Sequence, residues 1–221
     1  ILDQAQVVER DAANKAVRMC GTHTDITERK LMENQMRHQA LYDGLTQLPN
    51  RYLFEDRLGQ AMAKSKRTGC YGALMFLDLD NFKPLNDTHG HAVGDLLLIE
   101  VADRLRGCVR EADTVARIGG DEFVVKIDQL DTDEALSRKE AAATAEKIRL
   151  LLAQPYILKV TDEHGGETTV EHCCTASIGV ILFIGNQISQ EDIMKWADDA
   201  MYRAKDAGRN QVQFYELHHV H

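Results

Sequence analysis

The sequence lacks the features of several large classes of protein. It has no apolar run near the roughly 18 residues of a membrane-spanning helix, and its first residues, ILDQAQVVER, lack the features of a signal peptide. Its net charge of −9 is opposite to that of a general nucleic-acid-binding protein. We therefore expect a soluble, cytoplasmic chain without nucleic-acid or membrane partners. An anionic ligand would need a few local cations.

Paired cysteines are also lacking. The five cysteines are scattered, and none forms a Cys-x-x-Cys pair, although Cys173 and Cys174 are adjacent. This pattern argues against both a disulfide framework and a zinc site. There is no internal repeat and no low-complexity tract. Because the chain starts at Ile1 rather than at Met, we expect it to be a piece of a longer protein.

The length of 221 residues favours one main domain with an appendage. Residues 1–25 alternate between polar and apolar side chains, which predicts a β-hairpin too small to be a domain alone. A capping-box pattern then opens a predicted helix over residues 26–42, with Met32, Met36 and Ala40 on one face. A connecting helix packed on its neighbour and a dimerising signal helix are both compatible with this stripe.

The remaining chain alternates between helical and strand patterns, which predicts an α/β or α+β domain over residues 43–216. A loose tail follows at 217–221, and residues 81–91 are expected to form a turn. Helices are expected over residues 52–66, 93–106, 133–153 and 193–204. Strands are expected over residues 71–80, 114–117, 123–127, 155–160, 167–174, 175–183 and 211–215.

The segment ARIGGDEFVV places two glycines and two carboxylates between strand-like runs. Gly119 and Gly120 predict a tight hairpin turn, with Asp121 and Glu122 beside it. The glycines could serve the turn alone, or they could leave room for a polyphosphate against the backbone. Carboxylates beside a polyphosphate would need a cation between them.

A second acidic pair ends the strand LMFLDLD. The two-residue period of a strand puts Asp78 and Asp80 on the same face. A single Asp at such a place is usually a helix cap. If Asp121 lies on the adjacent strand, however, two acids and a free carbonyl would form an oxygen-rich cage that suits Mg²⁺.

Other polar residues have both a plain and a functional interpretation. Lys83, Lys205 and Arg209 are either solvated surface charges or cations of a phosphate site. Asn86 and Asp95 suit a turn and the first turn of a helix. In one pocket, the carboxylate acceptors of Asp95 would match the adjacent N–H donors of guanine, whereas adenine presents an acceptor at that edge.

Four motifs in order, DGLTQLPNR, FLDLDNFKPLNDTHGHAVGD, RIGGDEF and YRAKDAGRN, resemble the GGDEF family of diguanylate cyclases. The resemblance covers about residues 43–215. It implies a five-stranded central sheet flanked by helices, related to nucleotide cyclase and polymerase palm domains. It also implies a homodimer that joins two GTP molecules into cyclic di-GMP and releases pyrophosphate.

The resemblance implies a metal site and a catalytic group at the glycine turn. Asp78, the Leu79 carbonyl and Asp121 would hold Mg²⁺ or Mn²⁺, with Glu122 beside the metals. Asp121 would help to deprotonate the attacking 3′-hydroxyl. Lys83 and the metal would offset charge on the reacting phosphate.

The resemblance also implies contacts to the base and phosphates of GTP. Asn86 and Asp95 would recognise guanine. The residues expected around the phosphates are Lys83, Lys205, Arg209, Gly119 and Gly120.

Two further segments resemble parts of this family. In READ, Arg110 and Asp113 match the Arg-x-x-Asp pattern of a product-inhibition site for cyclic di-GMP. Residues 1–25, which end in GTHTD, resemble the last strands of a PAS sensor domain before a signalling helix. An active diguanylate cyclase is the leading hypothesis. The alternatives are a catalytically silent receptor for GTP or cyclic di-GMP, and a scaffold that acts through the helix.

Overall fold

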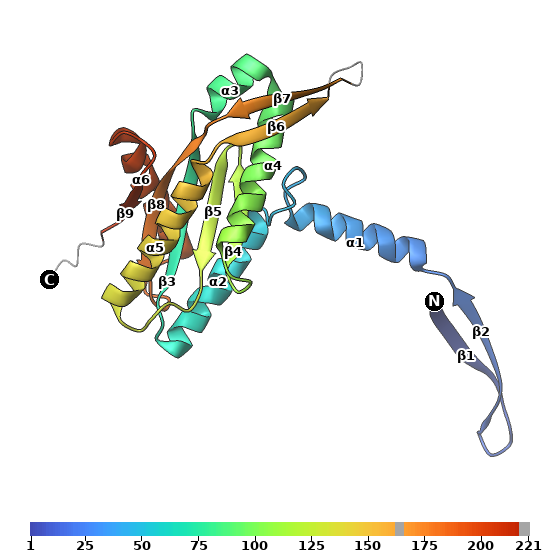
Figure 1. The fold of residues 1–221 in the computed structure, drawn as a ribbon. Coiled ribbons are helices and arrows are strands. Elements are labelled where there is room, and N and C mark those ends of the chain that lie inside the picture. Colours follow the sequence, from blue (N-terminus) through green and yellow to red (C-terminus); the bar gives the residue numbers. More distant parts are fainter. Residues whose placement is uncertain (162–165, 217–221) are drawn as a thin grey trace. The chain divides into compact units, whose positions relative to one another are not determined.

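A computed structural model describes residues 1–161 and 166–216, and it divides the chain into two compact units (Figure 1). The first unit is Ile1–Ala40, and the second begins at Leu41. The predicted tail at 217–221 and residues 162–165, which join the strands predicted at 155–160 and 167–174, lie outside the described residues.

The first unit contains the predicted hairpin and helix. Strands β1 (Leu2–Arg10) and β2 (Ala16–Thr24) pair antiparallel as a two-stranded sheet. Helix α1 (Thr27–Leu41) follows, and Asp25 Oδ1 accepts a hydrogen bond from the Thr27 N–H at 2.9 Å. The kinship of this hairpin to a PAS domain stays a prediction.

The second unit is built on a five-stranded sheet in the order β4-β5-β3-β8-β9. The strands are β4 (Thr114–Gly119), β5 (Glu122–Ile127), β3 (Gly72–Asp80), β8 (Thr175–Phe183) and β9 (Val212–Phe214). Only the β8–β9 pair is parallel. The predicted mixed α/β fold with a five-stranded central sheet is confirmed.

Helices cover both faces of this sheet (Figure 1). Helices α4 (His91–Cys108) and α5 (Glu134–Leu152) pack on one face. Helices α2 (Arg51–Thr68) and α6 (Gln190–Asp206) pack on the other. Because side chains alternate along a strand, β3 supplies both cores: Met75 and Leu77 face the first pair of helices, and Leu74 and Phe76 face the second.

The turn predicted at 81–91 is wrong, because helix α3 (Phe82–His89) occupies most of it and α4 begins at His91. Leu85 of α3 is buried, and Phe82 packs beside it against the core. Pro84 is compatible with this helix because it lies in the first turn, where a backbone N–H has no partner within the helix.

The strands predicted at 155–160 and 167–174 correspond to β6 (Tyr156–Thr161) and β7 (Glu167–His172), which pair antiparallel as a separate two-stranded hairpin. Tyr156 and Leu158 enter the core beside α4. The Arg104 guanidinium lies 3.7 Å from the centre of the Tyr156 ring, so the base of this hairpin is fixed to α4.

Helix α6 approaches strand β8 at Gly179. A Cβ atom at this position would lie 2.1 Å from the Ala197 carbonyl oxygen and 2.2 Å from the Met201 nitrogen. The helix and the strand therefore meet backbone to backbone. This contact sets the height of the last turns of α6, which carry Lys205, above the sheet.

Candidate active site

The register of β3 and β5 gathers acidic residues at one end of the sheet. Asp78 lies directly opposite Glu122, and the Leu79 N–H donates to the Asp121 carbonyl at 3.3 Å. The end of β3 and the glycine turn are thus neighbours, as the cage hypothesis required. Asp121 and Glu122 are half-buried.

Lys205 supplies a cation to this acidic group. Its Nζ lies 2.7 Å from Asp78 Oδ2, and the Asp78 side chain is only 11% exposed. Burial raises the pKa of Asp78 to about 6; the Lys205 hydrogen bond opposes this rise, and the charge of Asp121 adds to it. Of the three predicted phosphate-binding cations, Lys205 is therefore the one that pairs with a carboxylate at this end of the sheet.

Sequence reasoning missed Asp198, another acid of this region. Burial raises the pKa of Glu122, and the negative charge of Asp198 raises it further. Burial and the neighbouring Asp199 also raise the pKa of Asp198 itself. Asp198 precedes Lys205 by seven residues, two turns of the same helix, and this spacing was the available signal.

The carboxylates do not form a closed metal cage. Within residues 1–161 and 166–216, no group of three or more His, Cys, Asp or Glu side chains is arranged to hold an ion. Asp78, Asp121 and Glu122 therefore do not converge as three ligands, and Asp78 is engaged by Lys205. The donor set still suits Mg²⁺, which commonly takes one or two carboxylates and fills the other positions with water and phosphate oxygens.

The glycine turn is open on its outer side. Gly120 has a φ of +50°, and a Cβ atom at Gly119 or Gly120 would meet nothing within 4 Å. The Arg117 guanidinium holds the turn from inside, because it bonds both the Gly120 carbonyl and Asp43 Oδ1. Sequence reasoning did not single out Arg117, although it precedes the glycines inside the quoted motif RIGGDEF.

The two residues expected to recognise guanine come from α3 and α4. Asn86 Oδ1 is buried and has no hydrogen-bond partner among the described residues. A Cβ atom at Gly94 would lie 1.9 Å from this oxygen, so the missing side chain makes space for Asn86. Asp95 follows Gly94 directly and is exposed. The unpaired Asn86 oxygen thus lies against Gly94, the residue that precedes the exposed Asp95.

Lys83 and Arg209 are both exposed. Lys83 lies in the first turn of α3, directly after β3, and Arg209 lies in the turn after α6. Neither side chain forms an ion pair with a carboxylate in the part of the chain that the structure describes. Both are therefore available to an anionic ligand.

The Arg-x-x-Asp segment forms a turn between α4 and β4. Asp113 accepts the Arg110 N–H at 2.9 Å and the Asp128 N–H at 3.1 Å, one with each oxygen. Arg110 is exposed and lines a surface pocket with Asp113, Glu140 and Thr144. Asp113 thus has a structural role in addition to any role toward a ligand.

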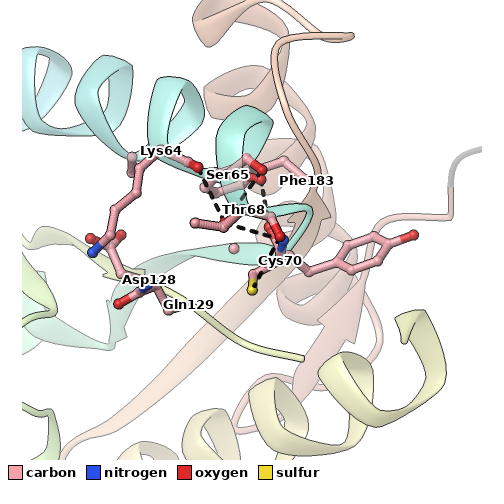
Figure 2. A pocket seen from close by; sticks show the side chains of 10 residues that line it. Lys64, Ser65, Thr68, Cys70, Asp128, Gln129 and Phe183 are labelled. Carbon is pink, nitrogen blue, oxygen red and sulfur yellow. Dashed lines mark hydrogen bonds between the residues drawn. The ribbon is translucent and has the colours of Figure 1, made fainter. Parts of the chain in front are cut away.

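A small pocket lies elsewhere, at the C-terminal end of α2 (Figure 2). It is lined by Lys64, Ser65, Cys70 and Asp128, among others, and Ser65 Oγ donates to the Cys70 carbonyl at 2.6 Å. Glu122 is the first residue of β5, whereas Asp128 directly follows its last residue, at the other end of the strand. This pocket therefore does not belong to the candidate active site.

Comparison with known proteins identifies the family. The family model described as "Diguanylate cyclase, GGDEF domain" matches residues 40–211. The chain belongs to the GGDEF family. This match includes the acidic end of the sheet, the glycine turn and the last turns of α6. No helix of the described GGDEF chain is long and apolar enough to cross a membrane.

Two curated relatives show how much of a longer protein the chain represents. It is 47% identical over 177 residues to the bifunctional diguanylate cyclase/cyclic di-GMP phosphodiesterase MucR of Pseudomonas aeruginosa, covering 80% of this chain and 24% of MucR. It is 37% identical over 194 residues to the diguanylate cyclase DgcM of Escherichia coli, covering 88% of this chain and 43% of DgcM. The GGDEF chain thus spans less than half the length of either relative.

Solved GGDEF structures resemble this one. The coiled coil and GGDEF domain of DgcB from Caulobacter crescentus, in complex with c-di-GMP, matches with a TM-score of 0.72 and 31% identity, over 86% of this chain and 93% of that one. The GGDEF domain of TpbB from Pseudomonas aeruginosa matches with a TM-score of 0.67 and 35% identity, over 78% of this chain and 99% of that one.

Proposed function

We propose that this GGDEF domain condenses two GTP molecules into cyclic di-GMP and two pyrophosphates. The observation that carries the proposal is the Asp78–Lys205 ion pair, 2.7 Å long, which lies directly opposite Glu122 and beside a turn without side chains. Carboxylates, a cation and an open glycine turn in one place suit phosphoryl transfer, where catalysis depends on positioning and charge.

Guanine would be recognised by the acceptors at α3 and α4. Its Watson–Crick edge offers adjacent N–H donors, which match Asn86 Oδ1 and the Asp95 carboxylate. The buried Asn86 oxygen without a partner supports this assignment, because a buried acceptor left unpaired costs about 1–3 kcal/mol until a ligand satisfies it. Adenine would place an acceptor against an acceptor, so the site should reject ATP.

The triphosphate would lie along the glycine turn. Gly119 and Gly120 leave the outer side of this turn open. Lys83 and Arg209 are exposed and available to phosphate oxygens, and Lys205 already lies among the carboxylates. These three cations would offset the charge of the triphosphate in a chain of net charge −9.

Mg²⁺ or Mn²⁺ would be held by Asp78, the Leu79 carbonyl and Asp121, with Glu122 beside it. Such an ion supplies charge neutralisation at the phosphates. Asp121 would accept the proton of the attacking 3′-hydroxyl, whose oxygen bonds the α-phosphorus of the second GTP as the bond to pyrophosphate breaks. Lys83 would stabilise the charge that develops on the transferred group.

The reaction would need two protomers, since each would present one GTP to the other. The exposed apolar side chains of α1, Leu31, Met32 and Met36, support pairing of this helix between two copies. The similar DgcB structure contains a coiled coil next to its GGDEF domain. Product could then bind at Arg110 and Asp113 and reduce activity from outside the catalytic site.

The test is to incubate the purified chain with GTP and Mg²⁺ and to identify the products by mass spectrometry. We expect cyclic di-GMP and pyrophosphate, and no product from Asp121→Ala, with Asp103→Ala as the matched control on the exposed surface of α4. Tight GTP binding without turnover would instead support the silent receptor. Equal product formation by Asp121→Ala would contradict the assignment of that residue.

A further inference from the structure

The second acid of the strand LMFLDLD has a different environment from the first. Asp80 is only 3% exposed, and it does not contact Lys205 as Asp78 does. Its Oδ1 accepts the Ser177 hydroxyl at 2.8 Å, and its Oδ2 accepts the Thr175 hydroxyl at 2.6 Å. The two acids, expected on one face, therefore have separate partners.

Asp80 has a third donor from a distant part of the chain. Its Oδ2 accepts the backbone N–H of Asn210 at 3.1 Å. Asn210 lies in the turn that joins α6 to β9, 130 residues further along the chain. The buried carboxylate thus connects the end of β3 to the turn that contains Arg209.

This turn has a backbone that needs support. Gly208, Arg209 and Asn210 have successive φ values of +112°, +62° and +46°. Glycine tolerates positive φ, but each residue with a side chain is disfavoured there and persists only where its surroundings hold it. Asn210 is held on one side by Asp80 and on the other by Arg149, which donates to Asn210 Oδ1 at 2.7 Å.

We propose that Asp80 is a positioning residue for phosphate binding. It fixes the N–H of Asn210, keeps the turn left-handed, and thereby directs the exposed guanidinium of Arg209 toward the phosphates of GTP. The inference rests on the proposed function, because it takes the anion near Arg209 to be the triphosphate. Asp80 itself touches neither substrate nor metal.

A carboxylate suits this position better than its neutral analogue. The three donors that converge on Asp80, two hydroxyls and one N–H, all need an acceptor. An ionised Asp accepts from all three with its two oxygens, whereas Asn has one oxygen, and the Ser177 hydroxyl would then have to accept from its NH₂ group instead of donating. Asp80→Ala would leave all three donors without this acceptor, and the backbone N–H of Asn210, unlike a hydroxyl, cannot rotate toward another one.

The test compares two ligands that share a base but differ in phosphates. 3′-Deoxy-GTP with Mg²⁺ lacks the attacking hydroxyl and so cannot react, and GMP lacks the β- and γ-phosphates. Asp80→Ala should weaken 3′-deoxy-GTP binding about tenfold, the factor that corresponds to one lost hydrogen bond, while GMP binding stays within about twofold. The double variant with Arg209→Ala should bind 3′-deoxy-GTP no more weakly than Arg209→Ala alone.

A second pair of variants avoids the core, in case Asp80→Ala does not fold. Asn210→Val and Asn210→Gly both remove the side-chain contact to Arg149, but only Val disfavours positive φ. Asn210→Val should show the triphosphate-specific loss, and Asn210→Gly should retain most of the affinity.

Three outcomes separate the inference from its basis. If Asp80→Ala, or Asn210→Val in its place, weakens both ligands equally, the role of Asp80 is structural only and the inference is wrong. If Asn210→Val and Asn210→Gly bind equally, the turn does not direct Arg209. If the natural chain binds 3′-deoxy-GTP no better than GMP, the proposed function itself fails.

Discussion

The guanidinium of Arg117 donates two hydrogen bonds to the carbonyl of Gly120, from Nε at 3.0 Å and from Nη2 at 2.7 Å. Its third nitrogen, Nη1, donates to Asp43 Oδ1 at 3.0 Å, and the side chain is 12% exposed. The fork fixes the residue directly before Asp121. Catalytic geometry at the turn should therefore depend on Arg117, a side chain outside the proposed set of GTP contacts.

Arg117→Lys should lower kcat about tenfold, because one ammonium group cannot reproduce two parallel bonds to Gly120 and a third to Asp43. KM for GTP should change less than kcat, since base recognition lies on other elements. Steady-state rates of pyrophosphate release would measure both. Arg67→Lys on the exposed end of α2 is the matched control. An unchanged kcat in Arg117→Lys would show that the geometry of the glycine turn does not depend on the Arg117 side chain.

Asp78→Asn should stabilise the metal-free protein at pH 7 while it abolishes activity. The pKa of Asp78 is raised from 3.8 to about 6, so the folded state binds its proton more tightly than the unfolded state. The free energy of unfolding therefore falls as pH rises from about 4 to about 6. The amide mimics the protonated form without this cost.

Urea unfolding in EDTA would measure the effect. We expect Asp78→Asn to raise the free energy of unfolding at pH 7 by about 1–3 kcal/mol, with the upper end set by the shift of about two pKa units, and the difference should shrink toward pH 4. A variant that is less stable at pH 7 would mean that the Lys205 ion pair outweighs the burial of the carboxylate.

Gly94→Ala should weaken GTP binding through Asn86. The added Cβ would lie 1.9 Å from Asn86 Oδ1, so the amide must move away from the position expected to face guanine. We expect KM for GTP to rise about tenfold, on the scale of one lost hydrogen bond. Gly107→Ala, where a Cβ meets nothing within 4 Å on the same helix, is the control.

Arg110→Ala should weaken the binding of cyclic di-GMP outside the catalytic site. A guanidinium can bind one phosphate of the product bidentately, and Arg110 is exposed in its turn. The product concentration that halves activity should therefore rise about tenfold, the scale of one charge-assisted hydrogen bond. Unchanged inhibition by added cyclic di-GMP would leave Arg110 as a solvated surface residue.

Deletion of residues 1–40 should reduce the rate at dilute protein more than at concentrated protein. The second unit has its own core, so it should remain folded. If α1 pairs as proposed, two domains without it must meet by diffusion, and the effective concentration supplied by the tether is lost. A specific activity that does not depend on protein concentration in either form would argue against this role of α1.

Much of the fold follows from local patterns. The strand at Gly72–Asp80, the helix at Glu134–Leu152 and the hairpin around the glycines were predicted, because periodicity and turn residues act over short distances. Helix α3 within residues 81–91 was not predicted, because the polar residues of this stretch suggested a turn. The burial of Leu85, which favours the helix, depends on the distant helices of the core.

The candidate site was predicted in its members more than in its contacts. Asp78 and Lys205 were both singled out, but their ion pair depends on how closely α6 packs on β8, which no local pattern gives. Asp80 and Arg117 also form long-range hydrogen bonds, to Asn210 and Asp43. Such bonds, 130 and 74 residues apart, have no signature in a single sequence.

The backbone contact of α6 at Gly179 limits how this part of the fold can change. Only a hydrogen atom fits between the strand and the helix at Gly179, since a methyl group there would collide with the backbone of Ala197 and Met201. The position of Lys205 above the sheet depends on this contact, so a larger residue at Gly179 would displace it.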